Sequence, residues 1–397
     1  MKKVLLLGGS RYLRPVIKAV HELGYYAVTC DYLPDNYAHK YADEYHNVSI
    51  LDKEAVLELA RDLAVDGVMS FACDPGVTTA AYVAEKLGLP THPYRSVQIL
   101  QNKALFRDFL AKNGFNVPKA KGYTDISEAV NDADIFSWPV IVKPTDSAGS
   151  KGVTKVEDKN DLRASIEYAL SFSHSNEFII EEFIEKKGDS SDTDCFSVNG
   201  ELVFASFDNQ KFDTNADNPY TPAAYTWPSE MSSENQAVLR SELQRLIRLL
   251  DLNTSIYNVE TRESTNGKPY IMEFSPRGGG NRLAEILEYA TGTELVKNAV
   301  RAAVGDEIPP MSDPVYNGFW AEIILHADKD GKFKKLSVDD ETKPYVFETD
   351  LWVEPGDEVH AFTAANFAIG TLVLRFDDRE TMNRIVNNIY DHIEVVV

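Results

Sequence analysis

Cysteine is scarce in this chain, and no hydrophobic run is long. The 397 residues include only three cysteines, Cys30, Cys73 and Cys195, which are far apart and form no C-x-x-C pair. This argues against a disulfide framework, a zinc site and a redox dithiol. The apolar stretch of MKKVLLLGG stops at Gly8, short of a signal peptide, and no later run could span a bilayer. These absences predict a reduced, cytoplasmic protein without a membrane partner.

Positive charge is also in short supply. Lysine and arginine number 40 against 62 aspartates and glutamates, which gives a formal net charge of −22. A field of this sign repels polyanions, so we expect no nucleic-acid partner. A small anion such as ATP can still bind where lysines, backbone N–H groups or metal ions reverse the charge locally.

Two nucleotide-binding fingerprints are missing. GGSRYL, after the first apolar run, lacks G-x-G-x-x-G, although Asp31 lies about where a ribose-binding acid would stand. A tight turn is therefore favoured over a nicotinamide or flavin site, and an NAD-dependent oxidoreductase stays open as an alternative. VIVKPTDSAGSKGV likewise lacks the P-loop pattern G-x-x-x-x-G-K-[ST].

The length exceeds what one hydrophobic core usually supports, so several packed units are expected. Apolar runs such as KKVLLLGG and YYAVTCDY alternate with amphipathic helices in the first hundred residues, which predicts a parallel α/β sheet with ligands at the carboxyl ends of its strands. Later, Asn-Gly dipeptides predict hairpins, and IPPMSDP separates a last unit. The predicted units are 1–100, 101–185, 186–312 and 313–397.

Lys143 is the first candidate for chemistry. It follows the apolar residues of VIVKP and would be costly if buried unpaired, so it either reaches water or meets a fixed anion. The next segment contains Ser147, Gly149, Ser150 and Gly152, whose small side chains and exposed N–H groups suit a loop that folds over phosphates. Together these residues predict a phosphate site.

A predicted hairpin supplies carboxylates. Glu260 and Glu273 lie near the ends of two strand-like runs joined by Asn266-Gly267, so they are expected on adjacent strands. Carboxylate oxygens together with substrate phosphates are what Mg²⁺ prefers. Arg277, just before three glycines, suits a transferring phosphoryl group or a carboxylate.

These motifs, in this order, resemble the ATP-grasp superfamily over nearly the whole chain, in the branch of the carbamoyl-phosphate synthetase large chain, biotin carboxylase and amino-acid ligases. DGVMSFACD and AEKLGLP are similar to the pre-ATP-grasp domain, FIIEEFIEKKGD resembles the adenine-binding linker, and IMEFSPRGGG resembles the E-x-N-x-R signature. The resemblance implies an α/β and α+β fold with three parts. These are an amino-terminal parallel α/β domain, a two-lobed ATP-grasp domain, and a small carboxy-terminal α+β unit.

The resemblance also implies roles for single residues. Lys103 and Lys143 would hold phosphates beneath the glycine loop, Arg277 and Lys143 would be catalytic, and Glu260, Glu273 and Ser275 would hold Mg²⁺ or Mn²⁺. The residues implied in binding the adenine and ribose of ATP are Glu181, Glu182, Phe183, Ile184 and Asp189, with backbone groups of Glu182 and Ile184 at the purine edge.

Two positions depart from the family pattern. The usual asparagine of the metal signature is Ser275, a shorter oxygen ligand, which puts one of the two metal positions in doubt. The ribose acid is usually a glutamate in a shorter loop, so the choice of Asp189 over Asp192 or Asp194 stays open.

The implied activity is ATP-dependent ligation through an acyl phosphate, forming a C–N bond, with an amino acid joined to an amine as the leading specific expectation. Activation of bicarbonate, a formyl group or a sugar-linked acid is the alternative within the class, and a non-catalytic nucleotide sensor is another outside it. The partners would be a small carboxylate and a small amine, and the superfamily commonly forms homodimers. The residues expected to face these substrates are Arg282, Asn281, Asp74, Arg11 and Lys211.

Overall fold

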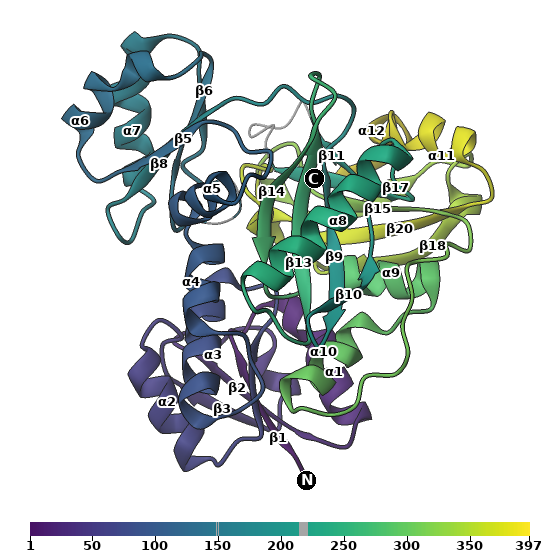
Figure 1. The fold of residues 1–397 in the computed structure, drawn as a ribbon. Coiled ribbons are helices and arrows are strands. Elements are labelled where there is room, and N and C mark those ends of the chain that lie inside the picture. The colour runs from purple at the N-terminus through teal and green to yellow at the C-terminus, as the bar shows by residue number, and fades with distance from the viewer. Residues whose placement is uncertain (148, 150, 214–220) are drawn as a thin grey trace.

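The fold is described from a computed structural model, which covers residues 1–147, 149, 151–213 and 221–397. Figure 1 shows an α/β unit at the amino-terminal end, a small lobe that projects to one side, and a larger body that contains the rest of the chain. Within the described ranges, no helix combines the length and the apolar character needed to cross a membrane.

The amino-terminal unit is the parallel sheet that the sequence predicts. Its four strands stand in the order β3-β2-β1-β4 and all run parallel. They are β1 (Lys3–Leu7), β2 (Tyr26–Asp31), β3 (Glu44–Asn47) and β4 (Gly67–Ser70). The connecting helices are α1 (Arg14–Glu22), α2 (Lys53–Asp62) and α3 (Asp74–Leu87). The central strand β1 is almost wholly buried, because helices cover both faces of a parallel sheet.

Two helices lead from this unit into the small lobe. They are α4 (Tyr94–Gln101) and α5 (Lys103–Lys112), and the Asn102 side chain between them caps α5 by accepting from the N–H groups of Ala104 and Leu105. The lobe contains an antiparallel sheet in the order β5-β8-β6-β7, with two helices on it. Its elements are β5 (Ala120–Tyr123), α6 (Ile126–Asn131), β6 (Val140–Pro144), β7 (Thr154–Val156), α7 (Leu162–Leu170) and β8 (Phe178–Glu182).

The large lobe is built on a second antiparallel sheet, in the order β10-β9-β13-β14. Its strands are β9 (Ser191–Val198), β10 (Glu201–Ala205), β13 (Ser255–Glu263) and β14 (Pro269–Ser275), and α8 (Ser233–Leu249) packs on β10 and β14. Both predicted Asn-Gly turns are present, at Asn199-Gly200 and Asn266-Gly267, where each glycine has a positive φ. The hairpin prediction is therefore confirmed.

A five-stranded sheet, in the order β11-β12-β15-β20-β18, joins the large lobe to the carboxy-terminal region. Its strands are β11 (Asn209–Phe212), β12 (Pro222–Trp227), β15 (Phe319–Leu325), β18 (Val346–Leu351) and β20 (Gly370–Phe376). The predicted boundary at residue 312 therefore separates strands that pair with one another, because β12 and β15 exchange backbone hydrogen bonds across it. The other boundaries stay predictions.

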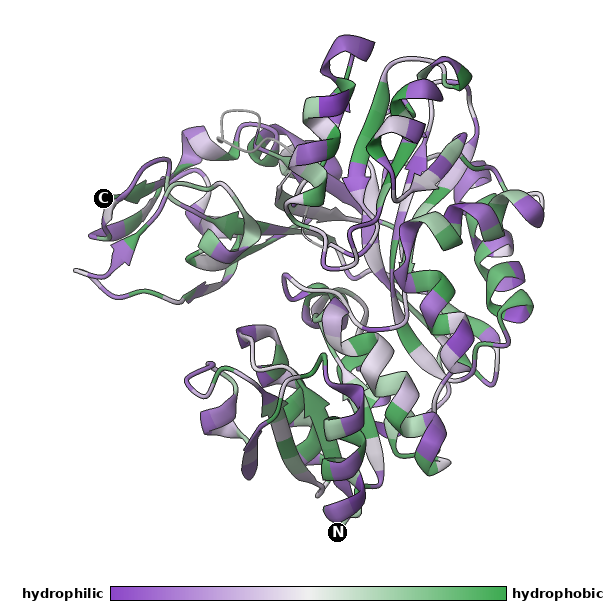
Figure 2. Cartoon of the chain, turned by 90° about the vertical axis from the view of Figure 1, so that its left-hand side faces the viewer, coloured by the Kyte–Doolittle hydropathy of each residue, from purple (hydrophilic) through white to green (hydrophobic). Residues whose placement is uncertain are grey.

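The remaining elements complete the core and its cover. The helices are α9 (Leu283–Thr291), α10 (Leu295–Ala303), α11 (Arg379–Val386) and α12 (Ile389–His392), and the short strands are β16 (Gly331–Lys332), β17 (Lys335–Val338), β19 (Glu358–Val359) and β21 (Ile393–Val396). One apolar cluster runs from α1 through α9 and α10 to Tyr225 and Trp320, so the first and third units share a core. Figure 2, coloured by the hydropathy of each residue, shows hydrophobic residues concentrated on the strands of the amino-terminal sheet.

Candidate active site

A cleft of about 870 Å³ opens where the amino-terminal unit, the small lobe and β14 meet. It begins at the carboxyl end of β4, the edge of the parallel sheet where the sequence places a ligand. Its polar lining includes Asp74, Gln101, Lys103, Ser147, Lys151 and Glu273. Four residues predicted for the site, each from a different segment of the chain, therefore face one space.

Lys103 stands at the centre of this cleft, in the first turn of α5. Its Nζ donates to the carbonyl oxygen of Ser147 at 2.9 Å and lies 3.9 Å from a carboxylate oxygen of Glu273. Through these two contacts Lys103 connects the start of the glycine loop to the predicted metal hairpin. In the described part of that loop, Gly149 and Gly152 have φ values of +66° and +72°, which glycine adopts easily. The prediction for Ser150 lies outside the described residues.

Lys143, on β6, belongs to a buried ionic triad. Glu181 on β8 accepts from Lys143 through one oxygen and from the Arg107 Nε, at 2.9 Å, through the other. The Arg107 guanidinium also donates to the backbone carbonyl of Met272 on β14, at 2.8 Å. Burial alone would raise the pKa of Glu181, but Arg107 and Lys143 lower it to about 2. Two cations thus share one carboxylate, which leaves a positive charge available for an anion such as a phosphate.

The metal hairpin presents three carboxylates in one row. Glu260 on β13 stands opposite Glu273 on β14 and, on its other side, opposite Asp192 on β9. Asp192 is half-buried beside them and accepts hydrogen bonds from Asn258 at 2.9 Å and Gln210 at 3.1 Å. Burial, followed by the charge of Glu260, raises the pKa of Asp192 to about 8. A row of oxygen donors that repel one another suits a hard divalent cation, so the residues fit Mg²⁺.

Arg277 is held between the amino-terminal unit and the hairpin. Its Nε and one terminal nitrogen each donate to Asp74, at 2.9 Å, and its other terminal nitrogen donates to Asn258, at 2.8 Å. Ser275 donates to the same Asp74 carboxylate at 3.1 Å and accepts from Gln101 at 2.8 Å. Asp74, expected to contact substrate, is thus the counter-ion of Arg277. Asp74 therefore connects the turn between β4 and α3 to the segment that carries Ser275 and Arg277.

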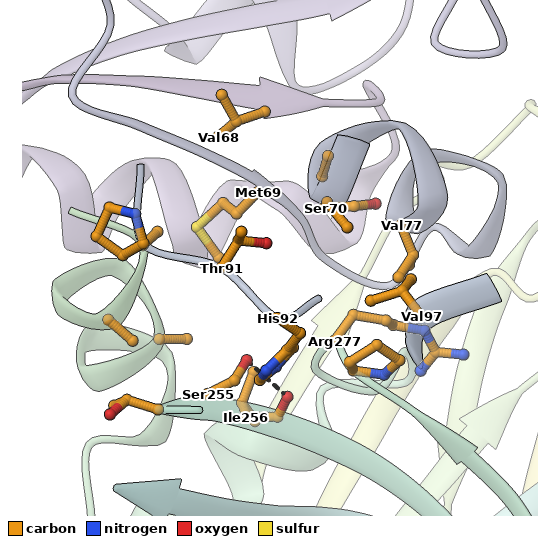
Figure 3. A pocket seen from close by; sticks show the side chains of 18 residues that line it. Val68, Met69, Ser70, Val77, Thr91, His92, Val97, Ser255, Ile256 and Arg277 are labelled. Atoms are coloured by element: carbon orange, nitrogen blue, oxygen red, sulfur yellow. Dashed lines mark hydrogen bonds between the residues drawn. The ribbon is translucent and has the colours of Figure 1, made fainter. Parts of the chain in front are cut away.

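Arg277 also borders a separate, small cavity of about 70 Å³ between β4, α10 and β13. Figure 3 shows this cavity, with His92 among the side chains that line it. The His92 Nδ1 accepts from the backbone N–H of Asn253 at 2.9 Å, while its buried Nε2 has no partner among the described residues. Burial lowers the pKa of His92 to about 4.

His92 is therefore expected to make the protein sensitive to acid. Below pH 6.5 the unfolded chain binds a proton on this histidine, whereas the folded chain does so only near pH 4. Between these values falling pH favours unfolding, and from pH 7 to pH 5 the loss through this group is about 2 kcal/mol. Urea denaturation at both pH values should show a smaller loss for His92→Gln than for the wild type. Equal losses would contradict this assignment.

The adenine linker and the ribose acid lie on either side of the lobe junction. The N–H groups of Glu182 and Phe183 donate to Lys119 and Pro139, so they are occupied. In the described part of the chain no hydrogen bond engages the N–H of Ile184, which therefore could meet a purine edge. Asp189 forms an ion pair with Lys211, at 2.8 Å.

One further acid and a half-buried asparagine complete the account of the predicted residues. Asp194 accepts from the N–H of Gly279 at 2.8 Å and so supports the glycine run, and burial raises its pKa to about 7. Asn281 is held on both sides, because it accepts from Tyr12 at 2.9 Å and donates to Tyr225 at 3.0 Å. The choice of ribose acid among Asp189, Asp192 and Asp194 stays a prediction.

The structure does not bring all predicted residues to the cleft. Lys143, Glu260 and Arg277 are not among the residues that line it. Arg11 and Arg282 line another pocket, which shares no lining residue with the cleft. Sequence reasoning also passed over Arg107 and Gln101, and it weighed Asp192 only for the ribose. The alternation of Asp192 and Asp194 along an otherwise buried strand was a signal for inward-facing acids, whereas Arg107 looks like any surface residue of an amphipathic helix.

Comparison with known proteins agrees with this geometry. Residues 136–285 match the family model described as the ATP-grasp domain. The chain is 24% identical over 313 residues to the uncharacterized protein y4rH of Sinorhizobium fredii, an alignment that covers 76% of this chain and 62% of that protein. It is 29% identical over 192 residues to the formate-dependent phosphoribosylglycinamide formyltransferase of Prochlorococcus marinus, covering 46% of this chain and 48% of that one.

The fold is likewise shared with solved structures. The L-amino acid ligase of Bacillus licheniformis superimposes with a TM-score of 0.80 and 19% identity, over 100% of this chain and 98% of that one. This likeness confirms the predicted fold class, including the two-lobed centre. The two curated relatives named above are matched over only about half to two thirds of their own lengths.

Proposed function

We propose that this chain, whose residues 136–285 match the ATP-grasp domain, is an ATP-dependent ligase that joins a carboxylate to an amine. The observation that carries the proposal is the meeting of Lys103 with Glu273 at 3.9 Å, in a cleft that also contains the start of the glycine loop. A cationic amine for a phosphate and a carboxylate for a metal ion are thereby brought to one place, as phosphoryl transfer requires.

In the proposed reaction, a substrate carboxylate oxygen forms a bond to the γ-phosphorus of ATP, and the bond between that phosphorus and the bridging oxygen of ADP breaks. An amine then attacks the carbonyl carbon of the acyl phosphate, phosphate leaves, and the amine loses a proton. Glu260, Glu273 and Ser275 would hold Mg²⁺ or Mn²⁺, which neutralises phosphate charge when bound.

Side chains of the protein would position ATP and neutralise the charge of its phosphates. Lys103 and Lys143 would bind the non-transferring phosphates, since the triad around Glu181 leaves one positive charge over. Arg277, fixed by Asp74 and Asn258, would stabilise charge on the transferring group without moving. The free N–H of Ile184 would bind the adenine edge.

The substrates are proposed more coarsely. The shared fold with an L-amino acid ligase supports an amino acid as one substrate. The relative named as a formate-dependent transferase supports a second candidate, in which formate is the acid that is activated. Small carboxylates and amines are the proposed partners, and absence of nucleic acid, a homodimer and a cytoplasmic location remain expectations from the sequence.

The test is ADP formation with Mg-ATP in a screen of amino acids, formate, bicarbonate and amines. With an active pair, Lys143→Met should lower kcat/KM by about 100-fold or more, because a charge-assisted contact to phosphate is lost. Lys121→Met is the matched control, because Lys121 lies on β5 of the same sheet and pairs with Glu128 and Asp132 at the surface. We expect its activity to stay within about 2-fold of the wild type.

Other outcomes would contradict the proposal. ATP binding without ADP formation for every acid would identify a nucleotide sensor. A change in nicotinamide fluorescence on binding, without ADP formation, would identify an oxidoreductase. Undiminished turnover in Lys143→Met would show that the active site lies elsewhere.

A further inference from the structure

A second pocket, of about 490 Å³, lies between α1, α9, α10 and the residues around β18. We call it the charged pocket, because five of its lining residues are basic (lysine or arginine) and five are acidic (aspartate or glutamate). These residues are Arg11, Arg14, Lys18, Arg282 and Lys297 with Glu22, Glu285, Glu288, Glu348 and Asp350. Its size is typical of a site for a small molecule.

The charges are not evenly mixed. Arg282 forms the inner end of the pocket, where its guanidinium is 8% exposed and meets Glu348 at 2.8 Å, Glu285 at 3.4 Å and Asp350 at 4.0 Å. Three carboxylates thus surround one cation. Arg282 was expected to hold a substrate carboxylate, but its nitrogens already face carboxylates of the protein.

Glu322, on β15, adds to this excess of acid. It is fully buried, and neither of its carboxylate oxygens has a partner among the residues that the structure describes. Burial raises its pKa well above the ordinary value, Arg282 opposes this rise, and the nearby Glu285 and Glu348 add to it. Burial also raises the pKa of Glu285, with Arg282 opposing and Glu348 adding to the rise. A further positive charge at the inner end would relieve this repulsion.

Lys18 and Lys297 both pair with Glu22. Arg11 and Arg14 differ from them, because no carboxylate in the described ranges pairs with either. The Arg14 guanidinium lies over the ring of Tyr41, at 5.2 Å, and that of Arg11 over the rings of Tyr37, at 3.6 Å, and Trp352, at 5.1 Å. Of these two cations, Arg11 is the one in contact with Trp352, which borders the acidic end of the pocket, so we take Arg11 as the group that receives an anion.

Trp352 connects the acidic end to Arg11. Its indole Nε1 donates to Asp350 at 2.9 Å, while its ring faces the Arg11 guanidinium. Trp352 therefore contacts both the acid that would face a cation, Asp350, and the arginine that would face an anion, Arg11. An amino acid carries both charges a few bonds apart, whereas a simple acid or a simple amine carries only one.

We propose that the charged pocket binds a free amino acid, with its ammonium group at Glu285, Glu348 and Asp350 and its carboxylate at Arg11. The inference rests on the proposed function, in which this amino acid is one of the two substrates. It adds that the ammonium group must be free, which excludes acids without an amine and amines without an acid from this position.

The test is calorimetric titration of the full chain with the common L-amino acids, each binder being compared with its N-acetyl and 2-hydroxy analogues. Loss of the ammonium charge should weaken binding by about 10-fold or more, the usual value of one charged hydrogen bond. Glu348→Gln and Asp350→Asn should each weaken binding of the amino acid by a similar factor. Glu354→Gln, an exposed acid of the same segment outside the pocket, is the control and should bind as the wild type does.

A fluorescent ATP analogue provides the second measurement, and its affinity should be the same in all these variants, which also shows that they fold. Equal binding of an amino acid and its N-acetyl derivative, or no binding of any amino acid, would overturn the inference. ADP formation with acids that carry no amino group would do the same while leaving the ligase proposal intact. Amino-acid binding without ADP formation would instead overturn the ligase proposal alone.

Discussion

Replacing Glu273 by glutamine is expected to lower kcat/KM for ATP-dependent turnover by about 1,000-fold or more, because the site loses a charged ligand of the divalent cation that neutralises the phosphates. Glu273 lies beside groups from two different parts of the site. It stands opposite Glu260 across the hairpin and lies 3.9 Å from Lys103. The amide keeps the shape of the side chain, so the expected loss reports charge and not packing.

Two measurements separate this effect from misfolding. The Mg²⁺ concentration for half-maximal turnover should rise in Glu273→Gln, while the urea midpoint should stay close to that of the wild type. Glu201→Gln is the control, since Glu201 lies on β10 of the same sheet with its side chain 61% exposed. Wild-type turnover and Mg²⁺ dependence in Glu273→Gln would remove the hairpin from the mechanism.

The parts of the site that short-range rules govern could be predicted from the sequence. Asn266-Gly267 favours a hairpin, so Glu260 and Glu273 were expected on adjacent strands. That they stand directly opposite each other depends on a register shift between Glu260 and Thr261, which the turn does not determine. The alternation of apolar runs and amphipathic helices likewise predicted the first parallel sheet.

The parts that depend on distant segments could not be predicted. Arg277 and Asp74 are 203 positions apart, and no periodicity or turn relates them. The same holds for β12 and β15, which pair across the predicted boundary at residue 312. Hydrophobic patterning indicates that a strand will be buried, but its neighbour in the sheet is chosen by packing of the whole molecule.

The burial of Arg107 could not be predicted either. An arginine in KALFRDFLAK is expected at the surface, yet here it is 3% exposed and bonded to Glu181. Sequence alone gave no reason to bury it, since the carboxylate that compensates it lies on β8, 74 residues further along the chain.

Removing the charge of Glu181 is accordingly the change expected to cost the most stability. Glu181→Gln would leave Arg107 and Lys143 buried without their shared counter-ion, and breaking a buried ion pair in this way typically costs about 3–5 kcal/mol of unfolding free energy. Urea denaturation should show this as a lower midpoint. Glu185→Gln, an exposed acid four residues away, should leave the midpoint unchanged.

The triad also links stability to the proposed ligand. In Glu181→Gln the two unpaired cations repel each other, so a bound triphosphate would relieve more repulsion than it does in the wild type. Added ATP should therefore raise the urea midpoint of the variant by more than that of the wild type. An equal rise in both proteins would mean that the phosphates lie away from Lys143, and an unchanged midpoint in Glu181→Gln without ATP would mean that the triad contributes little to folding.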